Sequence, residues 1–250
     1  MRNLAILATL MWFGCGSSPT GSNVDDVPAD VDLAILFVGN SLTYTNDLPD
    51  MVQRLLQAHG NVGDVGVGTV AFPNFGLMDH WAQGAARSAI ASGQWDYVVI
   101  QQGPSATEGR PSLLEYSRRF ADEVEAVGGR LALYMVWPAA NRFLDFNGVS
   151  ASYEAAAEQN DSLLFPAGEA WREAWALDPN LDLYGPDGFH PSLLGTHLAA
   201  LVIYQQLSGK DPRALPAEIP TAGGTLQLPI ELGDVLHDAA AAANAEFARP

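Results

Sequence analysis

The chain has 250 residues, 48% of them apolar, so it can bury one sizeable core without requiring a second domain. Its formal net charge is −17 and it has only 12 Lys and Arg, which argues against nucleic-acid binding, because phosphate surfaces are usually met by clustered basic side chains. The acidity also disfavours adsorption to anionic polymers and anionic lipid headgroups, but it leaves neutral and cationic substrates open.

The first residues have the pattern of an export signal. Arg2 precedes an apolar run from Leu4 to Phe13, which is too short to span a bilayer as a folded anchor. The run leads to Cys15, the single cysteine of the chain, at the place where a bacterial lipoprotein signal carries the residue to be lipidated. We therefore predict a signal peptide with a lipobox over residues 1–15, lipidation at Cys15 and a location outside the cytoplasm, periplasmic or at the cell surface. The alternative is a secretory peptide that is cleaved nearby, with loss of Cys15.

Three further segments follow from composition. Residues 16–30 are rich in Ser, Gly, Pro, Asp and Asn, which predicts a flexible tether. The main domain is expected over residues 31–210. Beyond it, residues 211–250 shift to Pro, Ala and Gly and then to an alanine-rich helix from about Val235 to Phe247. We expect this C-terminal extension to pack on the domain.

Short apolar runs alternate with helix-like segments along the main domain. Five such runs predict buried strands: Leu33–Val38, Val65–Val70, Tyr97–Ile100, Leu131–Val136 and Leu163–Phe165. Strands that alternate with helices imply a parallel sheet covered on both faces. The expected fold is an α/β three-layer sandwich with a five-stranded parallel sheet.

Helix signals lie between these runs. An apolar stripe follows Pro49 and is closed by Gly60, and another helix is expected from Leu77 to Ala91. Ser112 followed by Glu115 predicts a capping box at the start of the next helix. After the last strand, residues 193–207 form a strongly apolar helix.

A serine stands just past the carboxyl end of the first predicted strand. Ser41 follows Gly39 and Asn40 and shortly precedes a helix, and open α/β sheets bind ligands at this edge. Gly39 allows a tight turn, and nearby backbone amides can face a developing oxyanion. Alone, this pattern is also ordinary turn chemistry.

The second chemical element is Asp187-Gly188-Phe189-His190, immediately before the last long helix of the domain. With an aspartate three residues before a histidine, one short turn carries both side chains on the same side. The carboxylate can then hold one imidazole nitrogen while the other faces a serine. This base-and-orienter arrangement activates a hydroxyl nucleophile, and a histidine ordinarily titrates near neutral pH, which suits proton transfer in both directions.

Together these segments resemble the SGNH (GDSL-like) hydrolase family, in which the nucleophile follows the first strand and an Asp-x-x-His pair precedes the final helix. The resemblance covers about Leu33 to Leu207, with Gly39-Asn40-Ser41-Leu42 in place of the family's Gly-Asp-Ser-Leu block. It implies a flavodoxin-like fold, a Ser41, Asp187 and His190 triad, and chemistry without a cofactor or a metal ion.

The resemblance also implies an oxyanion hole made by Ser41 and two further donors. The family's glycine in the second block corresponds to Asn74, the residue that best replaces glycine at positive φ, and Gly76 is the alternative. In the third block the family has an asparagine, where this chain has Gln101-Gln102-Gly103-Pro104-Ser105. Gln102 is our first candidate for the donor, Gln101 is the alternative, and Ser105 occupies the asparagine's place by simple counting.

Other side chains are candidates for the pocket. We expect substrate contacts from Asn40, Gln101, Ser105 and Trp137. Aromatic and amide groups around the expected cleft would suit a sugar ring: Tyr44, Trp81, Trp137 and Asn141. His80 fits an interior helix position better than a binding role. His190 and His197 are seven residues apart, but no acidic residue or cysteine joins them at metal-ligand spacing, so no metal site is predicted.

The sequence thus predicts a serine esterase that acts on a short-chain acyl ester of a small molecule or a carbohydrate, for example an acetylated sugar. The alternative is a lipid-anchored carbohydrate-binding protein on the same fold without turnover. An acyltransferase is a third hypothesis, since only the acceptor differs. Membrane contact is expected only through the N-terminal lipid anchor, and no nucleic-acid partner is expected.

Overall fold

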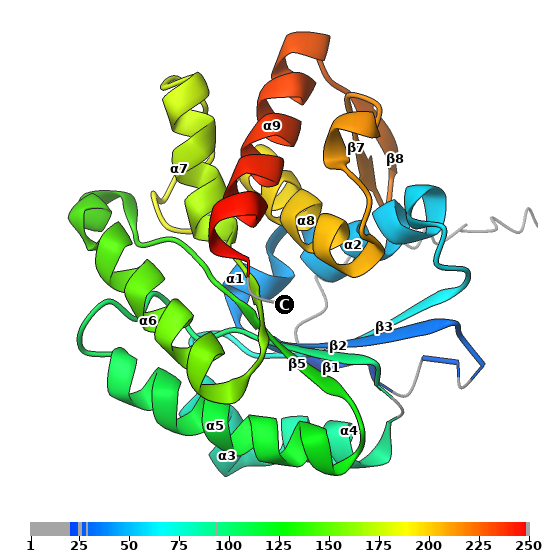
Figure 1. The fold of residues 1–250 in the computed structure, drawn as a ribbon, viewed down its shortest axis with the longest axis vertical. Coiled ribbons are helices and arrows are strands. Elements are labelled where there is room, and N and C mark those ends of the chain that lie inside the picture. Colours follow the sequence, from blue (N-terminus) through cyan, green and yellow to red (C-terminus); the bar gives the residue numbers. More distant parts are fainter. Residues whose placement is uncertain (1–20, 25–26, 29, 94, 249–250) are drawn as a thin grey trace, which may run out of the picture.

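The computed structural model describes residues 21–24, 27–28, 30–93 and 95–248, which form three layers around one mixed sheet (Figure 1). The strands are β1 (Gly21–Ser22), β2 (Leu33–Gly39), β3 (Val65–Ala71), β4 (Tyr97–Ile100), β5 (Arg130–Tyr134) and β6 (Leu163–Phe165). Their spatial order is β1-β3-β2-β4-β5-β6, and every pair except β1 with β3 is parallel. All five predicted strands are present, and the three-layer α/β/α architecture is confirmed.

Strand β2 is the centre of the sheet. All seven of its residues are buried, as expected for a continuous apolar strand covered on both faces. The chain passes from β2 to β3 on one side and then to β4 on the other. The carboxyl end of β2, at Gly39, is therefore a topological switch point, where open α/β sheets form their ligand crevice.

Helices cover both faces of the sheet. They are α1 (Ser41–Tyr44), α2 (Leu48–Leu55), α3 (Leu77–Gln83), α4 (Ala85–Ser92), α5 (Arg110–Ala126), α6 (Phe146–Asn160), α7 (Ala167–Leu177), α8 (Leu193–Ser208) and α9 (Ile230–Phe247), with short helical turns η2 (Thr45–Asp47), η3 (Leu56–Gly60), η4 (Ala140–Asp145) and η5 (Pro212–Ala214). Figure 1 shows α1, α2, α7, α8 and α9 on one face and α3 to α6 on the other.

Two helix predictions were wrong in detail. The single helix expected from Leu77 to Ala91 is two helices, because Gly84 between them has a φ of 90°, which ends α3 in the left-handed region. The capping box at Ser112 does not form. Helix α5 begins earlier, at Arg110 with a proline in its first turn, so Ser112 lies inside that turn.

The predicted tether over residues 16–30 was also wrong where the structure describes it. Strand β1 pairs antiparallel with β3, and Asn23 continues the contact by donating to and accepting from the backbone of Thr69. Val24 and Val27 pack against the core. The edge of β3 offers unpaired backbone groups, and a polar segment can satisfy them without any apolar pattern of its own. Residues 16–20 lie outside the described part of the chain.

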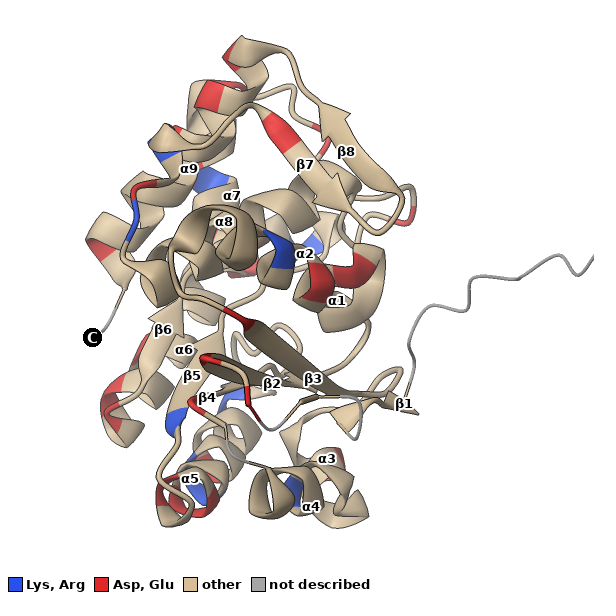
Figure 2. Ribbon diagram, turned by 90° about the vertical axis from the view of Figure 1, so that its right-hand side faces the viewer, with Lys and Arg blue, Asp and Glu red and all other residues tan. Residues whose placement is uncertain are grey.

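The C-terminal segment packs on the domain as expected, and it shares the core rather than extending from it. Helix α9 lies against α7 and α8, and its Leu236, Ala239 and Ala240 are buried. Between α8 and α9 the chain forms a hairpin that the sequence analysis did not predict, β7 (Glu218–Thr221) with β8 (Gly224–Gln227). The hairpin lies beside α2 (Figure 2).

Two further features of the fold concern the distribution of basic residues and the length of the helices. Figure 2 shows the Lys and Arg positions as separate short segments spread over several elements. Within the described residues, no helix combines the length and the apolar character that a membrane crossing requires. The predicted signal peptide and Cys15 lie outside the residues that the structure describes.

Candidate active site

Ser41 is the first residue of α1, directly after β2. Asn40 caps this short helix: its Oδ1 accepts from the Leu42 N–H at 3.0 Å, and its carbonyl accepts from the next two N–H groups. The Asn40 Nδ2 donates to the carbonyl of Phe75 at 2.9 Å. Asn40 therefore holds the serine turn to the loop after β3, while the N–H of Ser41 has no acceptor among the described residues.

Gln101, at the end of β4, fixes the same turn from the other side. Its Oε1 accepts from the Asn40 N–H at 3.0 Å and from the Thr43 hydroxyl at 2.9 Å. A Cβ on Gly39 would stand 2.2 Å from Thr43 Oγ1 and 2.7 Å from Gln101 Oε1, so only glycine fits there. Gln101 is 1% exposed. It was predicted as a substrate contact, but its burial and its bonds make it a positioning residue for Ser41.

Asp187 and His190 are paired as predicted. The Asp187 Oδ2 lies 2.5 Å from the His190 Nδ1, and the Oδ1 accepts from the N–H groups of Phe189 and His190 at 3.0 Å each. These bonds, the one from His190 first, lower the pKa of Asp187 to about 2. The carboxylate is thus ionised near neutral pH, and the other imidazole nitrogen, Nε2, is left for a second partner.

Trp137 holds the loop that carries His190 in place. The Trp137 Nε1 donates to the carbonyl of Phe189 at 3.1 Å, and its ring stacks on Trp171 with 3.6 Å between ring centroids. The Gly185 N–H donates to the His190 carbonyl at 2.7 Å. Trp137 is fully buried, so the predicted substrate contact is wrong, and the residue supports the histidine loop instead.

Replacing Trp137 with phenylalanine is expected to lower kcat on a short ester roughly tenfold, because the loop loses a bond that fixes His190, the predicted base. Trp175→Phe is the matched control: the Trp175 Nε1 donates to the Leu181 carbonyl at 3.0 Å within the same aromatic cluster. Each variant loses a bond that contributes about 1 kcal/mol to the free energy of unfolding. Equal kcat values for the two variants would contradict a positioning role for Trp137.

A cavity of about 250 Å³ brings the predicted blocks together. Its lining residues come from the ends of three neighbouring strands and from the histidine loop: Asn40, Ser41, Asn74, Phe75, Gly76, Gly103 and Phe189. His190 follows Phe189 directly. No hydrogen bond joins Ser41 Oγ and His190 Nε2 in the described part of the chain, and such contacts in unliganded serine hydrolases are often loose.

Asn74 is placed as the sequence predicted. Its φ is 61°, in the left-handed region that asparagine tolerates better than most residues, and it lines the cavity. The alternative, Gly76, is less suitable because its N–H donates to Asp79 Oδ2 at 2.8 Å. Asn74 is therefore the better backbone donor of the two.

Asn74→Gly is expected to keep the activity, because glycine adopts positive φ freely. Asn74→Ala is expected to lower the free energy of unfolding by about 1 kcal/mol and kcat by roughly tenfold, since the backbone moves to relieve the strain. Thermal unfolding and ester turnover measured on both variants check this. An alanine variant as stable and as active as the glycine variant would show that the conformation of Asn74 is unimportant.

Gln102 and Ser105 are not placed as predicted. The Gln102 Nε2 donates to Ser105 Oγ at 3.0 Å and to the Gly109 carbonyl at 2.9 Å, so both amide protons are committed inside the loop. Ser105 is 1% exposed, which also removes it as a substrate contact. Gly103 lines the cavity in their place, and the sequence analysis missed it. The position of Gly103 could have indicated this role, because a glycine after a strand end leaves its N–H accessible to a ligand.

Two further candidates, His80 and Trp81, lie outside the lining of the cavity. His80 is fully buried as expected: its Nε2 lies 2.8 Å from the Gly39 carbonyl, and burial lowers its pKa. The Trp81 ring packs edge-on against Phe120 and beneath the Arg87 guanidinium. Neither His80 nor Trp81 lines the cavity.

Neither protein-family models nor curated proteins match the sequence. Solved structures do match. A protein of Slackia heliotrinireducens assigned to the SGNH hydrolases is 25% identical with a TM-score of 0.59, over 70% of this chain and 98% of that one.

Two further structures are similar in fold. A DUF4886 family protein from Bacteroides uniformis has a TM-score of 0.71 at 16% identity, over 86% of this chain and 95% of that one. An acetyl xylan esterase from Geobacillus stearothermophilus has a TM-score of 0.57 at 17% identity, over 74% and 97%. By its fold, the chain belongs to the SGNH (GDSL-like) hydrolase superfamily.

Proposed function

We propose that the chain is a serine esterase with Ser41 as nucleophile, His190 as base and Asp187 as the residue that orients the base. The observation that carries this proposal is the Asp187 to His190 bond, on a loop whose Phe189 lines the same cavity as Ser41. A carboxylate that fixes one imidazole nitrogen beside a serine at a helix N-terminus is the arrangement that activates a hydroxyl group.

Ester hydrolysis by this site takes two steps. In the first, His190 Nε2 takes the proton of the Ser41 hydroxyl while Oγ attacks the ester carbonyl, and the same proton passes to the departing alcohol. In the second, a water molecule gives its proton to His190 and attacks the acyl-enzyme. The acid leaves as Ser41 regains its proton. Asp187 stays ionised throughout and stabilises the imidazolium.

The oxyanion of each tetrahedral intermediate needs hydrogen-bond donors in the cavity. We assign this role to the backbone N–H groups of Ser41, Asn74 and Gly103, because these three residues line the cavity. Gly103 replaces the predicted side-chain donor Gln102, whose amide is committed elsewhere. A backbone donor needs no reorientation during the reaction, so the change of donor is compatible with turnover.

The substrate we propose is a short-chain acyl ester, such as an acetyl group on a carbohydrate. The cavity beside Ser41 is about 250 Å³, which favours a small acyl group. The net charge of −17 favours an uncharged or cationic alcohol partner over an anionic one. A relative in fold is described as an acetyl xylan esterase, which makes acetylated sugars the first class to assay.

Labelling with a fluorophosphonate probe tests this proposal against the alternative of a carbohydrate-binding protein without turnover. The alternative is favoured by the commitment of Gln102, which removes one side-chain donor from the expected oxyanion hole. We expect the intact protein to be labelled at Ser41, and labelling to be lost in Ser41→Ala and strongly slowed in His190→Gln. Absence of labelling in folded wild-type protein would favour the binding protein.

The location outside the cytoplasm remains a proposal that rests on the N-terminal sequence. We propose lipidation at Cys15, the single cysteine of the chain. Incorporation of an alkyne-bearing fatty acid in a bacterial host, and its loss in Cys15→Ser, would support it. Equal incorporation in the variant would contradict it.

A further inference from the structure

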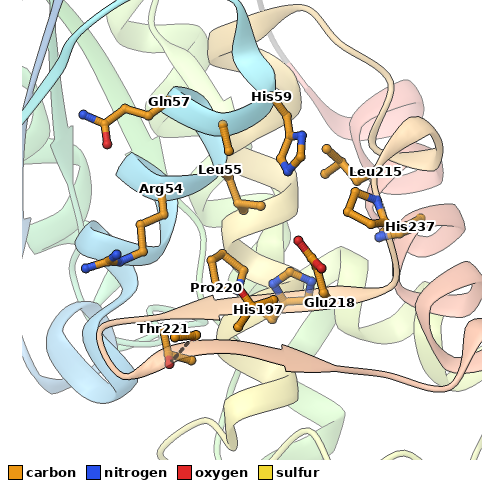
Figure 3. A pocket seen from close by; sticks show the side chains of 14 residues that line it. Arg54, Leu55, Gln57, His59, His197, Leu215, Glu218, Pro220, Thr221 and His237 are labelled. Atoms are coloured by element: carbon orange, nitrogen blue, oxygen red, sulfur yellow. Dashed lines mark hydrogen bonds between the residues drawn. The ribbon is translucent and has the colours of Figure 1, made fainter.

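A second cavity, of about 400 Å³, lies away from the serine site. It is lined by residues of α2 and η3, of α8, of the hairpin of β7 and β8, and of α9, and Figure 3 shows it from close by. The cavity shares no lining residue with the Ser41 cavity. Its volume falls in the range of small-molecule sites, and the esterase chemistry makes no use of it.

Two buried imidazoles line this cavity, and three of their ring nitrogens have no hydrogen-bond partner within the part of the chain that the structure describes. His197 on α8 is 1% exposed, and neither of its ring nitrogens has a partner among the described residues. The Nε2 of His237 on α9 is also buried and has no partner among these residues. A buried polar group left unpaired costs on the order of 1 to 3 kcal/mol, and native structures hold few of them. Two such groups on the wall of one cavity point to a ligand that completes them.

The protonation state of the two imidazoles determines which polar group of a ligand can bind to them. Burial lowers the pKa of His197 to about 3, with a smaller effect from His237, and burial also lowers the pKa of His237. Both rings are therefore neutral at pH 7, and each neutral ring offers one N–H donor and one acceptor nitrogen. A hydroxyl group, which both donates and accepts, matches this pair.

Charged ligands fit less well. Glu218, which faces the cavity, would repel a carboxylate, and it already accepts from Gln227 Nε2 at 2.8 Å. The Arg54 guanidinium is paired with Asp50 at 2.6 Å. Figure 3 shows His59, His197, His237 and Glu218 near one another, but within the described residues no group of three or more His, Cys, Asp or Glu is arranged to hold a metal ion.

The rest of the wall is largely apolar. Leu55 comes from α2, Leu215 and Pro216 from the segment before the hairpin, and Pro220 from β7. Such a wall favours an apolar ligand body, and the imidazoles supply its polar anchor. We propose that this cavity is a second binding site, for a small uncharged molecule with an apolar body and a hydroxyl group, and that His197 and His237 hold the hydroxyl.

Benzyl alcohol is a suitable probe, measured by ligand-observed NMR and by the side-chain nitrogen shifts of the histidines in the full chain. We expect it to bind and to move the His197 signals. Toluene, which lacks the hydroxyl, and benzoate, which is charged, are expected to bind about tenfold or more weakly than benzyl alcohol. Zinc ions are expected not to compete with it.

Two variants locate the site. Ala58 is an exposed lining residue, and Ala58→Trp is expected to block the cavity and abolish binding. Ala91→Trp, at an exposed helical alanine on the opposite face of the sheet, is the matched control and should bind as wild type. His197→Phe should weaken the binding of benzyl alcohol by about tenfold and leave the affinity for toluene unchanged. If that variant fails to fold, Ala58→Trp still decides the location.

Several results would overturn the proposal. Benzyl alcohol that fails to bind, or that binds Ala58→Trp as well as wild type, would exclude this cavity. Toluene bound as tightly as benzyl alcohol would remove the role of the imidazoles. Preferential binding of benzoate or of zinc would show that the site takes a charged ligand instead.

Discussion

Replacement of Ser41 with alanine is expected to lower kcat on p-nitrophenyl acetate by roughly 10³-fold or more, as removal of the nucleophile does in other serine hydrolases. The expected change in stability is small, because Ser41 is the first residue of a short helix and the cap is supplied by Asn40. Steady-state kinetics combined with thermal unfolding separate the two effects. The loss should fall on kcat with the fold intact.

Ser88→Ala is the control for this experiment, since Ser88 is an exposed serine on α4, on the opposite face of the sheet. It should turn over the ester as wild type does. A Ser41→Ala variant that kept wild-type kcat would exclude the serine as nucleophile.

Asp187→Asn is expected to lower kcat by roughly 10³- to 10⁴-fold. The amide that replaces the carboxylate cannot stabilise the imidazolium, and it favours the wrong tautomer of His190. Because the bond to His190 lowers the pKa of Asp187 to about 2, the wild-type carboxylate is ionised at all pH values well above that. The ratio of wild-type to variant kcat should therefore not depend on the ionisation of Asp187 between pH 5 and pH 9.

The sign of the acid effect follows from the same pKa. Since the folded pKa of Asp187 is below its ordinary value of 3.8, the pair contributes stability above about pH 4, and that contribution is lost as the pH falls toward about 2. The Asp187 side chain is 52% exposed, so the loss should be small. Asp182→Asn, at an exposed aspartate near the same loop, is the matched control and should keep wild-type kcat. A near-normal kcat in Asp187→Asn would contradict the triad.

The sheet was predictable because its signal is local. The strand runs are short, apolar and separated by helices, so Tyr97–Ile100 and Leu163–Phe165 were predicted with the bounds that the structure shows. Strand β1 was not predictable in this way, since its polar residues pair with a sheet edge that exists only in the fold. The break at Gly84 was missed because a glycine inside a helical pattern is often tolerated, so the residue alone did not show that the helix ends there.

The site, like the sheet, has some features with a local sequence signal and others that depend on the fold. Asp187 and His190 lie three residues apart, and one turn joins them, so their pairing could be inferred from spacing. The roles of Gln102 and Trp137 depend on partners 7 and 52 residues away, which no local pattern records. Gln102 was predicted as an oxyanion donor and Trp137 as a substrate contact. In the structure, both side chains instead hold loops of the site by hydrogen bonds.

The central claim is that Ser41 carries the acyl group during turnover, and rapid quenching with mass spectrometry tests it most directly. Protein mixed with excess p-nitrophenyl acetate, quenched in acid within the first turnovers and digested, should yield the peptide that contains Ser41 with the added mass of one acetyl group. His190→Gln should accumulate far less of this adduct. An active enzyme that showed no adduct on this peptide, or an acetyl group on another residue, would contradict the account.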